Sequence, residues 1–255
     1  MRFGVSCSFD WLPALKDAGY DYIETSLVGL LEKSEEEIAE ISKQLEQYDM
    51  KLEVVNCFFP FGKSLYSEDA EYFRDHAARG LRLAASLGCK IAVIGSGGAR
   101  RVPEDISVEL AKKQFSDILR ICGEEAEQYG IKIVVEPLRH KETNFNYTIT
   151  EGIEIANMAD HPAVGTLIDF FHFHCNDEPL EELDALDGPF YHTHLARPSF
   201  DRCFPQPLDA ETVRAWSQKL KALGYNDRLS LECRFTSNYK HELKVAREVL
   251  EIFNQ

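Results

Sequence analysis

Short apolar runs, rich in β-branched and aromatic residues, recur along the chain at a spacing of about thirty residues. The stretches between them carry apolar residues at three- and four-residue steps, which is the pattern of amphipathic helices. Eight runs can be counted, near residues 2–6, 20–25, 51–58, 89–95, 131–136, 164–170, 189–195 and 228–233. The sequence therefore predicts eight strands that alternate with helices.

Local signals place several helix ends. The clearest helix runs from Ser107 to Tyr129, with its apolar residues on one face. Another is expected to begin at Ser34, because Ser34 and Glu37 form a capping-box pair. Further helix N-caps are expected at Ser67, Thr150 and Asp209.

A glycine stands between a predicted helix and the next strand at four places. A left-handed glycine there ends the helix and turns the chain back toward the sheet. These residues are Gly19, Gly88, Gly130 and Gly224. Because the strands alternate with helices and no hairpin is predicted, the pattern favours an α/β fold, a single closed (β/α)8 TIM barrel. An open doubly wound sheet is the alternative, which the lack of a glycine-rich phosphate turn after the first strand disfavours.

Amino-acid composition and charge restrict the number of domains, the classes of partner and the cellular location that we expect. No stretch rich in Pro, Gly or Ser interrupts the chain, so residues 1–255 are expected to form one domain. The formal net charge of −15 repels polyanions and argues against nucleic acid as a partner. We expect a cytoplasmic protein without a membrane partner, because no signal segment or membrane-length apolar run is present. The seven cysteines are scattered without a C-x-x-C pair, which predicts reduced thiols.

Four predicted strand ends in the second half of the chain carry residues of metal-ligand type. They are Glu136, Asp169, His194 and Glu232. Burying a lone carboxylate costs on the order of several kcal/mol unless a cation or hydrogen bonds compensate. In a barrel, the ends of strands five to eight form one arc at the C-terminal face, where active sites of this fold lie. We therefore predict one shared divalent cation, and three carboxylates with one imidazole suit Mn²⁺, Mg²⁺ or Co²⁺.

Two pairs of neighbouring histidines lie near the predicted ligands, and in each pair one histidine is the better site candidate. We expect His192 and His194 to point to opposite faces of their strand, so that only one faces the barrel interior. His194 is preferred because it lies nearer the C-terminal end of the strand. His172 is preferred to His174 because it follows Asp169 by three residues.

Several short motifs surround these residues. They are Val135-Glu136-Pro137-Leu138, Glu142-Thr143-Asn144, Asp169-x-x-His172, His192-x-His194, and Gly224-Tyr225 before Leu231-Glu232. Together they resemble the sugar isomerase/epimerase group of xylose-isomerase-like TIM barrels, which includes the ketose 3-epimerases and is related to TIM-barrel AP endonucleases. The resemblance spans about the whole predicted barrel.

The resemblance implies roles for individual residues. The four strand-end residues would bind one divalent cation, with Mn²⁺ expected first. Glu142, His172 and Arg202 would hold hydroxyl groups or the ketose oxygen of the substrate, and Arg197 is the alternative to Arg202. Family members of this kind are often dimers or tetramers, so a homo-oligomer is expected.

The expected chemistry is proton transfer next to a carbonyl group. A cation bound to the carbonyl and adjacent hydroxyl oxygens stabilises the enediolate that forms when the proton leaves. Glu136 and Glu232 lie on non-adjacent strands and are expected to remove and return the proton as the catalytic residues. Return to the opposite face is epimerisation, whereas transfer to the neighbouring carbon is aldose–ketose isomerisation. The sequence leaves both reactions open.

Two further positions are candidate substrate contacts. The glycine-rich segment 95–101 follows the fourth strand and ends in Arg100 and Arg101, a combination that suits a phosphate or a sugar acid. A solvated loop is the alternative. Glu24 ends the second strand at the same face and is either a substrate contact or a strand-end acid.

Two other functions remain open. A metal-dependent phosphodiesterase on DNA, similar to the AP endonucleases, is disfavoured by the negative charge and by the lack of the extra Asp-x-His pair and histidines of a trinuclear cluster. A noncatalytic sugar-binding barrel would bind its ligand without metal and without proton exchange.

Overall fold

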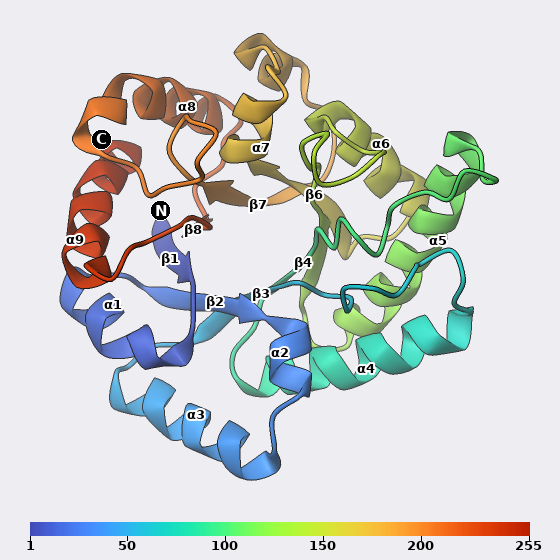
Figure 1. The fold of residues 1–255 in the computed structure, drawn as a ribbon, viewed down its shortest axis with the longest axis horizontal. Coiled ribbons are helices and arrows are strands. Elements are labelled where there is room, and N and C mark those ends of the chain that lie inside the picture. The colour runs from blue at the N-terminus through green and yellow to red at the C-terminus, as the bar shows by residue number, and fades with distance from the viewer.

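Eight parallel strands close into a barrel surrounded by helices (Figure 1). The computed structural model describes the backbone of residues 1–255 and all side chains except that of Ala185. Each strand pairs with the next along the chain, and β8 pairs with β1. The strands are β1 (Arg2–Ser6), β2 (Tyr22–Ser26), β3 (Leu52–Asn56), β4 (Ile91–Ile94), β5 (Lys132–Val135), β6 (Val164–Asp169), β7 (Phe190–Leu195) and β8 (Arg228–Leu231). The predicted TIM barrel is confirmed.

The helices lie outside the barrel, and α4, α5 and α6 pack side by side (Figure 1). The α-helices are α1 (Leu12–Ala18), α2 (Leu27–Leu31), α3 (Glu35–Gln47), α4 (Ala70–Ser86), α5 (Val108–Glu127), α6 (Ile149–Ala159), α7 (Phe170–Cys175), α8 (Ala210–Ala222) and α9 (Tyr239–Leu250). The short 3-10 helices are η1 (Phe9–Trp11), η2 (Leu180–Ala185), η3 (Pro207–Asp209) and η4 (Glu251–Asn254). The predicted apolar face of α5 is buried.

Several predicted helix ends are confirmed. The side chain of Ser34 accepts a hydrogen bond from the Glu37 backbone, and the Glu37 carboxylate accepts one from the Ser34 backbone, which makes the capping box of α3. Asp209 precedes α8 at the N-cap position, although its side chain makes no capping bond. Positive φ angles occur at all four predicted helix-ending glycines, Gly19, Gly88, Gly130 and Gly224.

Two predicted helix caps are wrong. Helix α4 begins after Asp69 instead of Ser67, because the Asp69 carboxylate accepts the backbone hydrogen bond of the first turn. Helix α6 begins after Thr148, which forms a capping box with Glu151 and leaves Thr150 inside the helix. An acidic residue three positions downstream, as Thr148 has, stabilises a cap in a way that Thr150 cannot reproduce.

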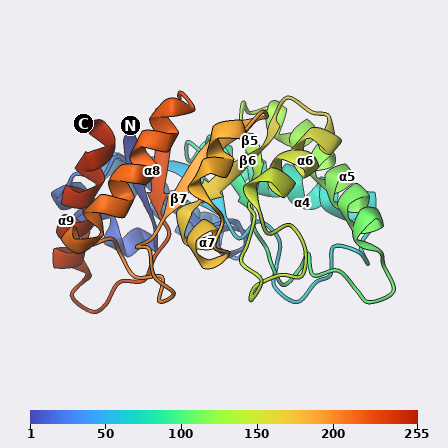
Figure 2. The same ribbon diagram turned by 90° about the horizontal axis from the view of Figure 1, so that it is seen from above.

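The two ends of the barrel differ. Long connections, among them residues 57–69, 95–107 and 136–148, gather at the C-terminal ends of the strands (Figure 2). At the other end the chain termini meet, and the amino group of Met1 lies 3.2 Å from Oδ1 of Asn254. Glu136 and Glu232 directly follow β5 and β8, so they lie at the end with the long connections. No helix in the described structure is both long and apolar enough to span a membrane.

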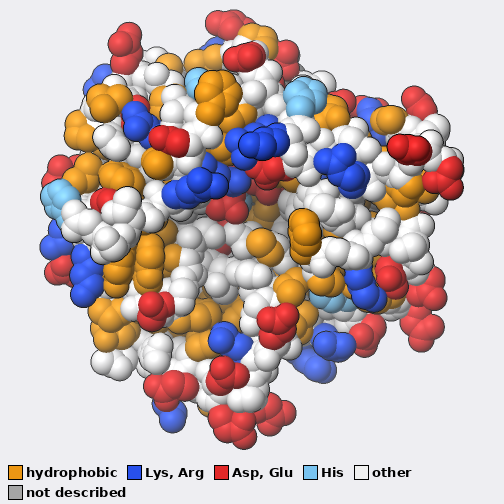
Figure 3. Space-filling model, in the orientation of Figure 1, with side chains coloured by type: hydrophobic (Ala, Val, Ile, Leu, Met, Phe, Trp, Pro, Cys, Tyr) orange, Lys and Arg blue, Asp and Glu red, His pale blue; other side chains and the backbone are white. Residues whose placement is uncertain are grey.

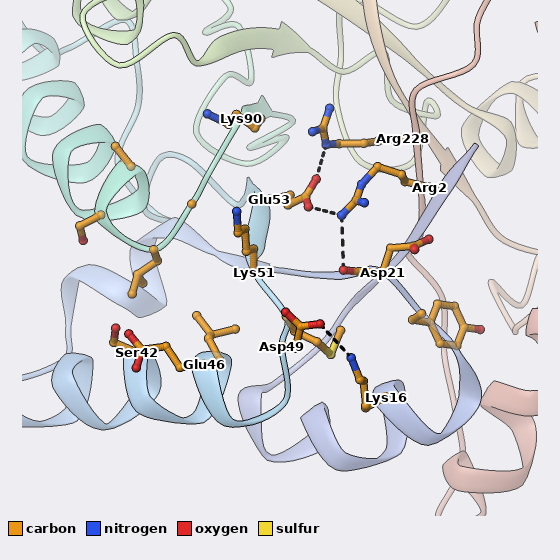
Figure 4. A pocket seen from close by; sticks show the side chains of 17 residues that line it. Arg2, Lys16, Asp21, Ser42, Glu46, Asp49, Lys51, Glu53, Lys90 and Arg228 are labelled. Atoms are coloured by element: carbon orange, nitrogen blue, oxygen red, sulfur yellow. Dashed lines mark hydrogen bonds and ion pairs between the residues drawn. The ribbon is translucent and has the colours of Figure 1, made fainter.

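A cavity of about 1000 Å³ opens at the end of the barrel where the strands begin. Its charged groups are mostly paired with one another (Figure 4). Glu53 accepts a hydrogen bond of 2.6 Å from Nε of Arg228 and also pairs with Arg2, while Lys16 lies 3.5 Å from Asp49. Glu53 is buried between the two arginines, whereas Lys16 and Asp49 are exposed. The cavity lies away from the strand ends that carry the candidate ligands.

Apolar side chains fill the middle of the barrel, where a buried cluster includes Val54, Val93, Val134 and Leu167. The layer above this cluster is polar, and Glu24, His192 and His194 in it are fully buried. Branched apolar residues usually fill the interior of this fold. A buried polar layer therefore needs compensating partners, and the end of the barrel that contains it is the candidate functional site.

Candidate metal centre

The four predicted ligands meet at the C-terminal end of the barrel. One donor atom from each of Glu136, Asp169, His194 and Glu232 lies within 4.8 Å of the others. Nδ1 of His194 is 3.1 Å from Oε1 of Glu136 and 3.3 Å from Oε2 of Glu232. Ligand atoms about 2.0–2.3 Å from a shared ion lie about 3–4 Å from one another. The donor set therefore fits a single divalent cation.

Each ligand is positioned by the strand that it ends. Glu136 continues the β5 ladder, because its backbone N donates to the carbonyl group of the last residue of β4. Asp169 ends β6, and its Oδ1 accepts a 2.7 Å hydrogen bond from N of Phe171 in α7. That bond leaves Oδ2 of Asp169 for the ligand group. Glu232 follows β8 and is held by a 3.2 Å hydrogen bond from its backbone N to O of Leu195 in β7.

The structure corrects the prediction for the two histidines of β7. His192 and His194 both face the barrel interior, are fully buried, and have ring centroids 4.9 Å apart. Residues two positions apart on a strand share a face, so the expectation of opposite faces is wrong. His194 belongs to the four-donor group. His192 precedes it on the strand, where its Nε2 lies 3.3 Å from Oγ of Ser230.

Glu24 lies against His194 on the side away from the other ligands. The two carboxylate oxygens of Glu24 are 3.1 and 3.2 Å from Nε2 of His194, and Nδ2 of Asn56 donates to Oε1 at 2.9 Å. Potential ligand atoms of Glu24, His192 and His194 form a second close group. Glu24 is fully buried, so its side chain has no exposed surface from which to contact a substrate.

Arg202 and His172, which are predicted substrate contacts, border the ligand group. Nη2 of Arg202 pairs with the Glu232 carboxylate and lies 3.3 Å from Oδ2 of Asp169. Nε2 of His172 lies 3.4 Å from the same oxygen of Asp169. Arg197, the alternative to Arg202, instead forms a 3.2 Å ion pair with the aspartate that precedes α8. Of the two arginines, the fold therefore brings only Arg202 to the ligand group.

Glu142 connects two arginines at the rim of the site. It accepts a 2.7 Å hydrogen bond from Nε of Arg139 and lies 3.9 Å from Nη1 of Arg202. Both guanidinium groups stack on the buried ring of Phe171, with centroid distances of 4.7 and 4.8 Å. Lys and Arg side chains border one side of the central hollow, with Asp and Glu side chains between them (Figure 3). Sequence reasoning missed Arg139, although it lies within the segment that joins Glu136 to Glu142.

Arg100 does not line this hollow. Its side chain is fully buried, and its guanidinium carbon lies 5.8 and 5.9 Å from the ring centroids of Phe115 and Phe145. Burial lowers the pKa of Arg100 to about 10, because desolvation disfavours the charged form. Arg101 is exposed beside it. Contact between Arg100 and a substrate requires movement of the loop and stays a prediction.

The two expected acid–base groups have pKa values shifted in opposite directions. Burial and the negative charge of Glu232 raise the pKa of Glu136. Burial also opposes ionisation of Glu232, but the charges of Arg202 and His194 outweigh it and lower the pKa of Glu232. Such a divergence suits a pair in which one carboxyl group holds a proton and the other is ionised.

Known proteins similar to this chain share one fold. A family model described as the xylose isomerase-like TIM barrel matches residues 12–255. An inosose isomerase of Bacillus velezensis is 25% identical over 253 residues, which cover 91% of this chain and 87% of that protein. A D-psicose 3-epimerase crystallised in the presence of D-fructose superimposes with a TM-score of 0.80 at 18% identity, over 100% of both chains. The IolI protein with a bound zinc atom has a TM-score of 0.76 at 22% identity, over 100% of this chain and 98% of that one.

Proposed function

Because the chain belongs to the xylose isomerase-like TIM barrel family, we propose that it is a divalent-metal-dependent isomerase or epimerase of sugars or sugar phosphates. It is an isomerase or epimerase, in keeping with the activities named for the similar inosose isomerase and D-psicose 3-epimerase. The observation that carries the metal proposal is the convergence of four donor atoms within 4.8 Å. Mn²⁺ is the proposed ion because the donor set is rich in oxygen and contains one imidazole, with Mg²⁺ and Co²⁺ as alternatives.

The proposed reaction uses the two carboxylates that flank His194. A cation held by the four ligands would supply positive charge to stabilise an oxyanion next to the reacting carbon. Glu136 and Glu232 approach from the non-adjacent strands β5 and β8, so one can remove a proton and the other can return one. Glu136, whose pKa burial raises, is the group that holds the proton more readily.

The substrate is proposed to bind at the rim above these carboxylates. Arg202, His172 and Glu142 border the ligand group there and present donors and acceptors of hydrogen bonds. Hydroxyl and carbonyl oxygens of a sugar match such groups.

Deuterium exchange tests the function directly. Inosose and a set of free and phosphorylated ketoses are incubated with the protein in deuterated water, first with Mn²⁺ and then with a chelator. The expected result is deuterium uptake next to the carbonyl group that the chelator abolishes, measured by mass spectrometry. No uptake with any sugar, together with cleavage of abasic DNA, would instead identify an AP endonuclease. Sugar binding that is insensitive to chelator and without exchange would identify a noncatalytic barrel.

A further inference from the structure

We propose that Glu24 is a positioning residue that orients the imidazole of His194 so that Nδ1 faces the cation. The inference rests on the proposed metal site and assigns a role to a residue outside the four ligands. Glu24 lies at the far side of the His194 ring from Glu136 and Glu232, so it contacts the ligand without belonging to the four-donor group.

The hydrogen bonds of His194 decide which nitrogen is free to bind an ion. A neutral imidazole has one N–H donor and one lone pair. Nε2 lies 3.1 and 3.2 Å from the two oxygens of Glu24, and an ionised carboxylate only accepts hydrogen bonds. Nε2 therefore carries the proton and donates to Glu24. The lone pair is then on Nδ1.

Nδ1 of His194 is directed at two further carboxylates. Its distances are 3.1 Å to Oε1 of Glu136 and 3.3 Å to Oε2 of Glu232. Nδ1 facing two carboxylates needs a positive charge between them, which is its own proton in the imidazolium form and a bound cation in the neutral form. A divalent cation at this position satisfies Nδ1 and both carboxylates, provided that Glu24 keeps the proton on Nε2.

Glu24 is itself fixed by a buried network. Nδ2 of Asn56 lies 2.9 Å from Oε1 of Glu24 and 3.2 Å from Oε1 of Glu232. The Asn56 amide therefore contacts both Glu24 and a candidate metal ligand. On the other side, Nε2 of His192 lies 3.5 Å from Glu24 and 3.3 Å from Oγ of Ser230. Glu24 and its partners Asn56, His192 and Ser230 are 0–6% exposed. The carboxylate therefore has little freedom to turn away from His194.

The same network argues against a second cation at Glu24, His192 and His194. Both oxygens of Glu24 already accept from His194 or Asn56, and His192 has Ser230 as a partner. Hydrogen bonds satisfy a buried carboxylate without an ion. We therefore expect one cation per chain.

Calorimetric titration of Mn²⁺ into the chelator-treated full chain tests this role. The parent is expected to bind one Mn²⁺, and Glu24→Gln is expected to bind it about 10–100-fold more weakly, since loss of a supporting partner has that effect. Glu53→Gln is the matched control, because Glu53 is also a buried carboxylate at 5% exposure but lies at the base of the barrel. Its Mn²⁺ affinity should equal that of the parent. Circular dichroism of the metal-free proteins checks that each variant is folded.

The Mn²⁺ affinity and the number of bound ions distinguish the positioning role from a second metal site. Equal Mn²⁺ affinity of the parent and a folded Glu24→Gln variant overturns the positioning role. Two ions in the parent and one in the variant also overturn it, in favour of a second metal site. If Glu24→Gln does not fold, Glu24→Asp is measured in its place. Its shorter side chain withdraws the carboxylate from Nε2 of His194, so an unchanged Mn²⁺ affinity in Glu24→Asp would contradict the positioning role. Failure of the parent to bind Mn²⁺, Zn²⁺, Co²⁺ or Mg²⁺ overturns the proposed metal dependence and this inference with it.

Discussion

Single side chains at the ends of β5 and β8 combine two tasks in the proposed mechanism. Glu136 and Glu232 are each a candidate ligand and a candidate proton carrier, and both contact His194. Amide substitution separates the tasks, because a carboxamide oxygen can still be a ligand whereas the group no longer exchanges a proton at neutral pH.

Glu232→Gln is expected to bind substrate and to lose turnover. General acid–base catalysis contributes about 10²–10⁴-fold, so kcat should fall by that factor. The measurements are kcat, the dissociation constant of substrate, and metal content of the same preparation. Activity near that of the parent, with normal metal content, would exclude Glu232 as a proton carrier.

Gly95 gives the Glu136 side chain its space. A Cβ atom at residue 95 would lie 2.2 Å from Oε2 of Glu136, which is the movable end of a side chain. We therefore expect Gly95→Ala to displace this carboxylate, to weaken Mn²⁺ binding at least about tenfold, and to change the unfolding temperature of the metal-free protein little. Gly29→Ala is the control, since its Cβ would make only ordinary contacts of 3.5 Å. Unchanged Mn²⁺ affinity in Gly95→Ala would mean that Glu136 is not a ligand.

At the scale of elements, helix starts are determined by side chains that accept hydrogen bonds from the first backbone N–H groups. Helix α6 has two such acceptors. Thr148 makes the capping box with Glu151, and Oε2 of Glu178 accepts a 3.0 Å hydrogen bond from N of Ile149. Glu178 comes from the segment after α7, so this contact ties two successive βα units together.

Stability at this contact should depend on pH. Burial is the main cause that raises the pKa of Glu178 to about 7, despite the hydrogen bond from Ile149 that lowers it. The folded pKa thus exceeds the unfolded value of about 4.3, so the contribution of Glu178 to stability is complete below that value and is lost as pH rises through about 7. Glu178→Gln should therefore raise the unfolding temperature relative to the parent at pH 8 and have less effect at pH 5.

Thermal unfolding at several pH values measures this difference. Glu181→Gln, at an exposed position nearby, controls for the loss of one negative charge. A temperature difference between Glu178→Gln and the parent that stays constant from pH 5 to pH 8 would contradict the assigned titration.

For the molecule as a whole, closure of the barrel makes one site out of four distant segments. The candidate ligands lie on or directly after β5, β6, β7 and β8, which are consecutive in the ring. A cation bound there would connect half of the barrel strands. Since an ion that binds only the folded state stabilises it, metal binding and global stability should be coupled.

Chelator treatment is expected to lower the unfolding temperature, and added Mn²⁺ to restore it. An ion at 100 times its dissociation constant adds about 2.7 kcal/mol to the free energy of unfolding. Calorimetric scans at increasing Mn²⁺ concentration measure the coupling, with Glu136→Gln/Glu232→Gln as the variant in which it should weaken. An unfolding temperature independent of Mn²⁺ and of chelator would argue against a folded-state metal site.

The amino-acid sequence alone determined the architecture and the candidate ligands. Apolar periodicity, the capping pair at Ser34 and the helix-ending glycines are local features, so they predicted the eight βα units before any contact was known. The position of Glu136 and Glu232 at the ends of apolar runs likewise followed from the chain itself. The wrong assignments at Ser67 and Thr150 arose because neighbouring acceptors compete for the same backbone groups.

The tertiary structure decided which atoms meet. Asn56 also ends a strand with a polar side chain, a signal that sequence reasoning missed, but its contact with Glu24 and Glu232 exists only because the barrel closes. Burial of Arg100 between two rings was likewise fixed by packing. The shared face of His192 and His194, in contrast, follows from the two-residue period of a strand and could have been predicted from the sequence. Local sequence specifies where each strand ends. The distances between donor atoms are set by closure of the sheet, which brings together strands that lie far apart in the chain.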